Sequence, residues 1–98
     1  MSLDLHIKCS HAVLQKLQDK HNVSYLEVNQ CFINRDGGFL EDPREDHKTK
    51  PATEWFIAET NKSRKLKVCF VQVGSEIDVK TAYEPNYEEI SIYDANAY

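Results

Sequence analysis

Four basic residues lie in or beside two neighbouring segments whose sequences are typical of β-strands. Arg64, Lys65 and Lys67 belong to the first segment, and Lys80 belongs to the second. Because side chains alternate between the two faces of a strand, Lys65 and Lys67 share one face, and Asp78 shares a face with Lys80. If the two segments pair as a hairpin, the cations form a compact basic spot. We therefore predict a phosphate-binding site made by Lys65, Lys67 and Lys80.

The same pattern also has an ordinary structural interpretation. Leu66, Val68 and Phe70 alternate with the lysines, so they would form the buried face of the strand and pack against helices. The cations would then belong to the solvated face of an antiparallel sheet and bind nothing. A face that contacts only a partner protein is the third interpretation.

His47 is a further candidate, as a mobile acid or base. It lies in the almost wholly polar segment 41–51, which predicts a surface loop of the kind that often contacts a partner. A loop histidine can equally be exposed without any role. His6 and His11 have no third ligand at a zinc-binding spacing, so the sequence predicts no metal site and no cofactor. Three cysteines without a CxxC spacing predict reduced, buried thiols: Cys9, Cys31 and Cys69.

The composition of the chain predicts a single domain that spans residues 1–98. Hydrophobic residues make up 41% of the chain and charged residues 29%, a balance typical of globular proteins and not of disordered ones. No apolar run approaches the roughly 18 residues that a membrane span requires, and no secretory signal is visible. We therefore expect a cytoplasmic protein. The net charge of −4 argues against nonspecific nucleic-acid binding over the whole surface.

Capping signals predict two helices in the first third of the chain. Ser10 is a suitable N-cap for a helix that extends to about His21. Ser24 begins a second helix, because Glu27 stands three residues later and completes a capping box. The expected buried side of the first helix consists of Val13, Leu14 and Leu17. The expected buried side of the second consists of Val28, Cys31 and Phe32.

Strand and turn signals fill most of the remaining chain. Segments 53–60, 65–73 and 76–83 are rich in β-branched and aromatic residues, and the turns between them are short enough that neighbours must pair as antiparallel hairpins. Two glycines in the segment 34–38 predict a turn with positive φ angles. Pro85 is expected in the first turn of a last helix. That helix would carry Tyr87, Ile90 and Tyr93 and so form an aromatic cluster with Tyr83.

These elements define the expected fold. It is an α+β domain with the order α-α-β-β-β-α, in which an antiparallel sheet of three or four strands carries its helices on one face. The optional fourth strand is a short one near Phe39 and Leu40. Trp55, in the first long strand, is expected in the core or at an interface.

Two parts of the chain resemble the BrnT family of toxins, which belongs to the RelE-like group of small ribonucleases from bacterial toxin–antitoxin pairs. The first part, residues 20–28, is similar to the family's Lys-His-Gly-Val-Ser-Phe segment, with Asn22 in place of the glycine. Asparagine also tolerates left-handed backbone angles. The second part comprises the strands that begin at Arg64 and Ile77, followed by Glu89 and Tyr93, which match the family's closing Glu-x-x-x-Tyr. The resemblance extends from about residue 14 to residue 93.

The resemblance implies metal-independent RNA cleavage, which requires a base, cations near the phosphate and an acid. The cations that remain as candidates for catalysis are Arg64, Lys67 and Lys80, and the candidate acids or bases are His47, Glu89 and Tyr93. The chain departs from the family where members typically carry arginines, because these positions hold Asp78, Tyr83, Glu88 and Ile90.

We therefore expect a toxin-like protein that is weakly active or has lost catalysis. Its expected partners are RNA and a basic antitoxin protein. The alternative is a non-enzymatic interaction module whose partner docks on the sheet edge or on the loop 41–51. For a toxin-like protein, the acidic net charge of −4 implies a positively charged partner, so a basic antitoxin would separate the two hypotheses.

Overall fold

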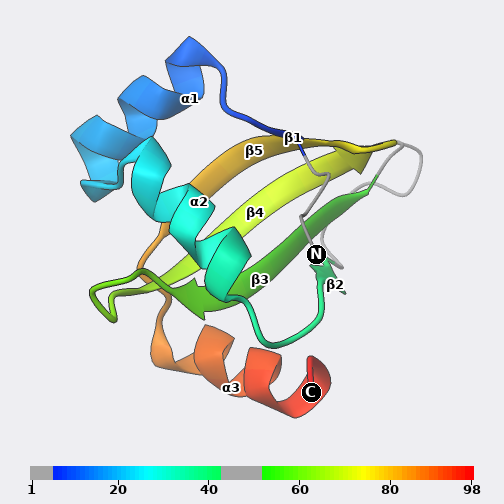
Figure 1. Ribbon diagram of the computed structural model, residues 1–98. Helices are drawn as coiled ribbons and strands as arrows, with labels where there is room; N and C mark the ends of the chain where they lie inside the picture. Colours follow the sequence, from blue (N-terminus) through cyan, green and yellow to red (C-terminus); the bar gives the residue numbers. More distant parts are fainter. Residues whose placement is uncertain (1–5, 43–51) are drawn as a thin grey trace.

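Five strands form one mixed sheet with the order β1-β5-β4-β3-β2, and helices lie against it (Figure 1). The computed structural model describes residues 6–42 and 52–98. In this part of the chain the elements are β1 (His6–Lys8), α1 (His11–Lys16), the π-helical turn η1 (Leu17–His21), α2 (Tyr25–Asn34), β2 (Leu40–Glu41), β3 (Thr53–Glu59), β4 (Lys65–Val73), β5 (Glu76–Tyr83) and α3 (Tyr87–Asn96). No helix in these ranges is long and apolar enough to cross a membrane.

The three long strands confirm the predicted meander. β3 pairs antiparallel with β4, and β4 pairs antiparallel with β5. The tight turn between β4 and β5 places Gly74 at a φ of +62°, which glycine adopts without steric cost. The turn between β3 and β4 places Ser63 at a φ of +64°. The segments rich in β-branched residues therefore form hairpins where the sequence predicts them.

The prediction of a purely antiparallel sheet is wrong. β1 pairs in parallel with β5, with Ile7 opposite Ile77, and adds a strand at one edge. β1 has three residues, too few to show the alternation that reveals a strand in a sequence. At the other edge, the short strand expected near Phe39 and Leu40 exists as β2, in which Leu40 pairs with Trp55. The sheet thus has five strands and not three or four.

One face of the sheet packs on α2, as expected for Leu66, Val68 and Phe70. All three side chains are fully buried. The ring of Phe32 in α2 lies 4.7 Å from the ring of Phe56 and 5.5 Å from that of Phe70. The predicted buried side of α2 is confirmed, whereas the first helix buries only Leu17 among its three expected apolar residues.

The prediction that all helices lie on one face is also wrong, because α3 covers the opposite face near β3. Trp55 and Ile57 alternate along β3 with Phe56 and Ala58, and all four are buried. Phe56 faces α2, so Trp55 faces away from it, and the Trp55 ring lies 5.6 Å from the ring of Tyr93 in α3. A strand that is apolar on both faces needs cover on both faces. Of the expected tyrosine cluster, only Tyr93 is buried in this way, since Tyr87 is 84% exposed.

The helix starts follow the capping signals. The Ser10 hydroxyl accepts from the Val13 amide, and Ser24 with Glu27 forms the predicted capping box. Asn22 ends the π-helical turn with a φ of 54°, which agrees with its tolerance of left-handed angles. In α3, however, the N-cap is Asn86, which forms a capping box with Glu89. Pro85 therefore precedes the helix and does not lie in its first turn.

Gly37 is required for a reason other than the predicted positive φ. Neither glycine of the segment 34–38 has a positive φ. A Cβ atom at Gly37 would lie 2.7 Å from the Tyr93 hydroxyl oxygen, which is closer than such atoms approach. The same hydroxyl donates to the Gly38 carbonyl at 2.7 Å, and the Gly38 amide donates to the Ala97 carbonyl at 2.9 Å. Glycine is thus needed for the close approach of the segment 36–39 to α3.

Candidate functional site

Arg64, a predicted catalytic residue, joins three elements at the end of the β3–β4 hairpin. Its guanidinium donates to the His21 and Asn22 carbonyls at 3.0 and 2.7 Å, where η1 leaves carbonyls without helical partners. It also forms ion pairs with Glu27 at 3.0 Å and Glu84 at 2.8 Å. These bonds direct its donors into the protein, so they hold the helices to the sheet.

The Glu27 and Arg64 pair also changes the acidity of both groups. Partial burial alone would raise the pKa of Glu27, but hydrogen bonds from the Ser24 amide and from Arg64 outweigh burial and lower it. The hydrogen bond to Glu84, with the contacts to Glu27, raises the pKa of Arg64 above its usual value. Both groups are therefore charged in the folded protein at neutral pH.

Lys67, predicted to bind phosphate and to act in catalysis, is buried under α3. It is 5% exposed, and its ammonium lies 2.9 Å from a Glu89 carboxylate oxygen. The Tyr83 hydroxyl donates to the same oxygen at 3.0 Å. The ammonium also lies 4.5 Å from the centre of the Trp55 ring, within the range of a cation–π contact. Lys67 is thus enclosed by protein groups and neutralised by Glu89.

Lys80 lies at an irregularity of the sheet. Cys69 is opposite Thr81 and Phe70 is opposite Val79, so Lys80 has no partner across the ladder. Its ammonium pairs with Asp78 at 3.2 Å, and both side chains are about half exposed. The predicted sharing of a face by Asp78 and Lys80 thus results in a local ion pair.

Lys65 differs from the other three cations. It is exposed, lies opposite Glu59 in the β3–β4 ladder and forms no ion pair with any described residue. Three of the four predicted cations are therefore paired with carboxylates of the protein itself, and Lys65 is not.

The candidate acids and bases lie in different environments. His47 is outside the described residues. Tyr93 is 1% exposed, and burial raises its pKa to about 12, so it stays protonated and holds the Gly38 carbonyl. Burial alone would raise the pKa of Glu89, but its bonds to the Asn86 amide, Lys67 and Tyr83 lower it. Tyr93 and Glu89 therefore do not exchange protons readily near neutral pH, as a general acid or base must.

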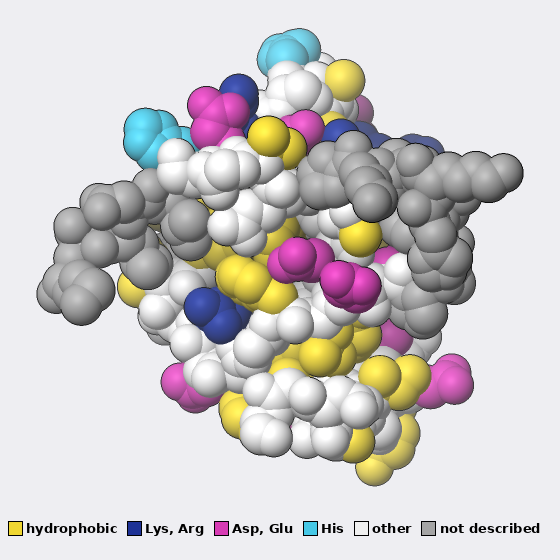
Figure 2. Space-filling view, turned by 90° about the vertical axis from the view of Figure 1, so that its right-hand side faces the viewer, with side chains coloured by type: hydrophobic (Ala, Val, Ile, Leu, Met, Phe, Trp, Pro, Cys, Tyr) yellow, Lys and Arg dark blue, Asp and Glu magenta, His cyan; other side chains and the backbone are white. Residues whose placement is uncertain are grey.

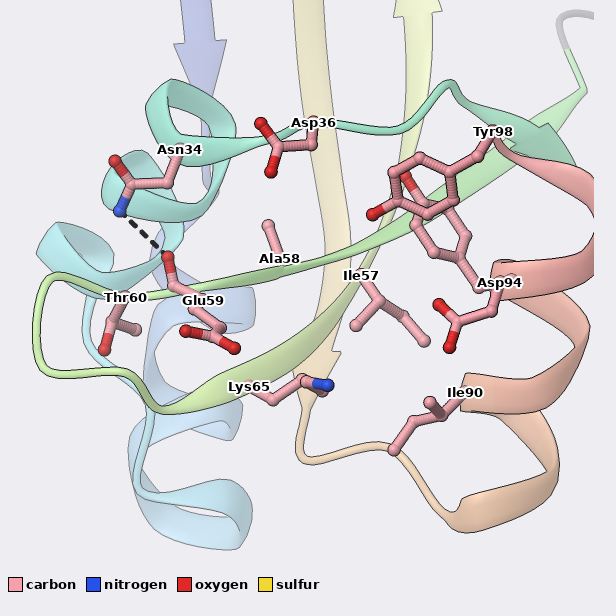
Figure 3. Close-up of a pocket in the computed structure, with 11 residues that line it drawn as sticks. Asn34, Asp36, Ile57, Ala58, Glu59, Thr60, Lys65, Ile90, Asp94 and Tyr98 are labelled. Carbon is pink, nitrogen blue, oxygen red and sulfur yellow. Dashed lines mark hydrogen bonds between the residues drawn. The ribbon is translucent and has the colours of Figure 1, made fainter.

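A groove of about 310 Å³ runs along the outer edge of β3, between the end of α2 and α3 (Figure 3). We call it the β3 groove. β2 covers only the first part of this edge, since its residues pair with Glu54 and Trp55. From β3, the residues that line the groove are Ile57, Ala58 and Glu59. Its lining residues are Asn34, Asp36, Ile57, Ala58, Glu59, Thr60, Lys65, Ile90, Tyr93, Asp94 and Tyr98.

The β3 groove carries more negative than positive charge. Asp36, Glu59 and Asp94 supply three carboxylates, and Lys65 supplies one ammonium. Figure 3 shows the Asp36 and Asp94 side chains projecting over the groove from opposite sides. Figure 2 shows acidic side chains among hydrophobic ones toward the end of the molecule that holds α3. Within the described ranges no three His, Cys, Asp or Glu side chains gather to hold a metal ion, so these carboxylates act as separate charges.

The sequence anticipates the sheet edge as a docking place but not the residues of this groove. Asp36 and Asp94 stand in a turn and on a helix, where isolated aspartates are common. Only the packing of α3 on the second face of the sheet brings them to opposite sides of β3. The available signal was the uninterrupted apolar run 55–58, which indicates that both faces of this strand are buried.

The lowered pKa values of Glu27 and Glu89 predict that the protein loses stability in acid. Both carboxylates bind protons less readily in the folded than in the unfolded state, so the stability that they add is present above their usual pKa of 4.5 and is lost as the pH falls through the folded values. Glu54 opposes this trend, because burial raises its pKa. Urea denaturation between about pH 7 and pH 3 should show the free energy of unfolding falling below about pH 5.

Glutamine variants separate the contributions to this acid loss. Glu27→Gln and Glu89→Gln should each flatten the dependence of stability on pH, because the proton linkage disappears with the carboxylate. Glu88→Gln removes an exposed carboxylate from the same helix as Glu89 and is the control. A pH profile that is the same in all three variants would contradict the assignment.

A comparison of the chain with models of known protein families finds no match, and a comparison with curated proteins finds no similar sequence.

Proposed function

We propose that the protein is a toxin-like module without catalytic activity that binds a basic partner protein in the β3 groove. The observation that supports this proposal most directly is the state of the predicted catalytic cations. Arg64, Lys67 and Lys80 are each paired with a carboxylate of the protein itself.

Metal-independent RNA cleavage needs cations that can move onto the charge that develops at the phosphate. A phosphate at Lys67 would first have to displace Glu89 and open the contact between α3 and the sheet. A phosphate at Arg64 would have to compete with two carboxylates and two carbonyls. Lys65 alone gives a weak site, because a single exposed lysine gains little from one phosphate.

The chemistry of the β3 groove favours a cationic protein partner. Its three carboxylates outnumber its single ammonium, and the whole chain carries a net charge of −4. Ile90 and Tyr98 add apolar surface beside the carboxylates, and Tyr98 is 75% exposed. Apolar anchors next to complementary charges are the usual composition of a protein-binding surface.

Selection from a random peptide library tests this function. We expect enrichment of peptides rich in lysine and arginine, and the double variant Asp36→Asn with Asp94→Asn should weaken their binding about tenfold or more. The matched control is Asp19→Asn with Glu88→Gln, which makes the same change in charge outside the groove. Failure to enrich any peptide, or equal binding by both double variants, would contradict the proposal.

Titration with labelled single-stranded RNA tests the ribonuclease alternative. We expect no cleavage and no measurable binding at low salt. Binding that falls with salt at a log–log slope of about −1.5 to −3, which corresponds to two to four phosphate contacts, would instead support the nucleic-acid alternative. Growth arrest on expression, relieved by Lys67→Ala with Lys80→Ala in a variant whose circular dichroism shows that it remains folded, would support catalysis and reject the proposal.

A further inference from the structure

The hydrogen-bonding direction of β3 can be read from bonds at its two ends. The Thr60 amide donates to the Arg64 carbonyl, so the backbone groups of Thr60 point toward β4. The Thr53 carbonyl accepts from the Asp42 amide, so those of Thr53 point outward. Backbone groups in an antiparallel ladder alternate in direction along the strand. Residues 55, 57 and 59 therefore present their amides and carbonyls to the outer edge.

Some of these outward groups already have partners. Trp55 pairs with Leu40 of β2. The Ile57 amide faces the Tyr93 hydroxyl oxygen and opposes the rise in the pKa of that hydroxyl, and the Glu59 carbonyl accepts from the Asn34 amide nitrogen at 2.9 Å. Two groups remain in the β3 groove, the Ile57 carbonyl and the Glu59 amide, and no described residue bonds to them. They are one acceptor and one donor, on either side of Ala58.

This pair matches the bonding of a parallel strand. In a parallel ladder, each bonded residue of the incoming strand lies opposite one residue of the neighbouring strand. Its amide donates to the carbonyl of the residue before that one, and its carbonyl accepts from the amide of the residue after it. An antiparallel strand would reach these two groups through two different residues, whose remaining groups would then face the Ile57 amide and the Glu59 carbonyl, where Tyr93 and Asn34 already lie. In the parallel direction a single residue reaches both groups, so the contacts of Tyr93 and Asn34 stay in place.

We propose that the basic partner of the protein binds as an extended segment that adds a parallel strand to β3, with one residue bonded to the Ile57 carbonyl and the Glu59 amide. This inference rests on the proposed function and defines its geometry. Strand addition at an open sheet edge is an established mode of peptide recognition.

The surrounding charges define the sequence of the segment. The residue opposite Ala58 faces the α2 side, where the Asn34 side chain already crosses to the strand, so it should be small. Its two neighbours face the α3 side, toward Glu59 and Asp94, so they should be basic. The preferred pattern is therefore basic, small, basic.

A synthetic peptide tests the geometry directly. The probe is an octapeptide with a central lysine, alanine and arginine flanked by threonines, titrated into the ¹⁵N-labelled full chain. On binding, the Glu59 amide should shift and become protected from hydrogen exchange, whereas the Ile57 amide should change little because it faces the Tyr93 hydroxyl and not the probe. Glutamates in place of the two basic residues should abolish binding.

Backbone N-methylation of the probe separates strand addition from simple charge attraction. Methylation of the central alanine nitrogen removes the donor to the Ile57 carbonyl and should weaken binding about tenfold or more. Methylation of the preceding lysine nitrogen is the control, because that amide points away from β3 in a parallel strand. If both peptides bind equally well, or if the peptide binds without protecting the Glu59 amide, the strand inference is wrong. Charge-dependent binding would still support the proposed function in that event.

Discussion

Replacement of Glu89 by alanine is expected to lower the free energy of unfolding by about 3 kcal/mol or more. The substitution leaves the Lys67 ammonium buried beside Trp55 without its carboxylate, and it removes the bond to Tyr83 and the capping box of α3. A buried charge that has lost its partner is far more costly than an ion pair is stabilising. Urea denaturation followed by circular dichroism measures the change.

A double-mutant cycle identifies the buried charge as the cause. In a Lys67→Met background the same Glu89→Ala substitution should cost only about 1 kcal/mol, mainly through the lost helix cap. Methionine has a similar length to lysine and keeps the contact with Trp55. Equal costs in the two backgrounds would show that Lys67 and Glu89 are not coupled, and Lys67 would then be available for a phosphate.

Replacement of Arg64 by alanine is expected to lower the free energy of unfolding by about 2 to 3 kcal/mol. It leaves the His21 and Asn22 carbonyls without donors and separates Glu27 from the hairpin. Thermal and urea unfolding give the magnitude. Arg64→Lys should recover only part of the loss, because an ammonium cannot reproduce the planar set of donors.

Lys80→Ala is the matched control for Arg64→Ala. It removes an ion pair in which both side chains are about half exposed, so its expected cost is about 0.5 kcal/mol or less. The two residues were predicted for the same catalytic role, and the structure assigns them different surroundings. An Arg64→Ala variant as stable as Lys80→Ala would restore Arg64 as a free cation and a catalytic candidate.

Local signals in the sequence predict the local structure well. Ser24 and Glu27 define the start of α2, and the turn at Gly74 separates two strands at the expected residues. These features depend on neighbours within about four positions, so a short stretch of sequence contains the necessary information.

Long-range packing is less accessible from the sequence. The pairing of β1 with β5 joins residues that lie far apart in the sequence, such as Ile7 and Ile77, and three residues of strand give no periodic signal. The alternation rule places Lys65 and Lys67 on one face correctly. It cannot show that α3 returns to cover Lys67, because the cover depends on Glu89 and Tyr93 from a distant helix.

The candidate site likewise has one part that the sequence predicts and one part that depends on long-range packing. The sheet edge could be proposed from topology alone, whereas the β3 groove requires the position of α3. Asn34 and Tyr93 decide which backbone groups of β3 stay open, and their roles appear only when both sides of the strand are assembled.

The position of Trp55 gives the protein an intrinsic optical probe. Trp55 is the single tryptophan of the chain, and its ring lies 4.5 Å from the Lys67 ammonium and 5.6 Å from the Tyr93 ring. Indole emission shifts to longer wavelength when water reaches the ring, and a nearby ammonium alters its intensity. Separation of α3 from the sheet would change both properties at once. The fluorescence of the unlabelled protein therefore reports on the contact that holds Lys67 away from solvent.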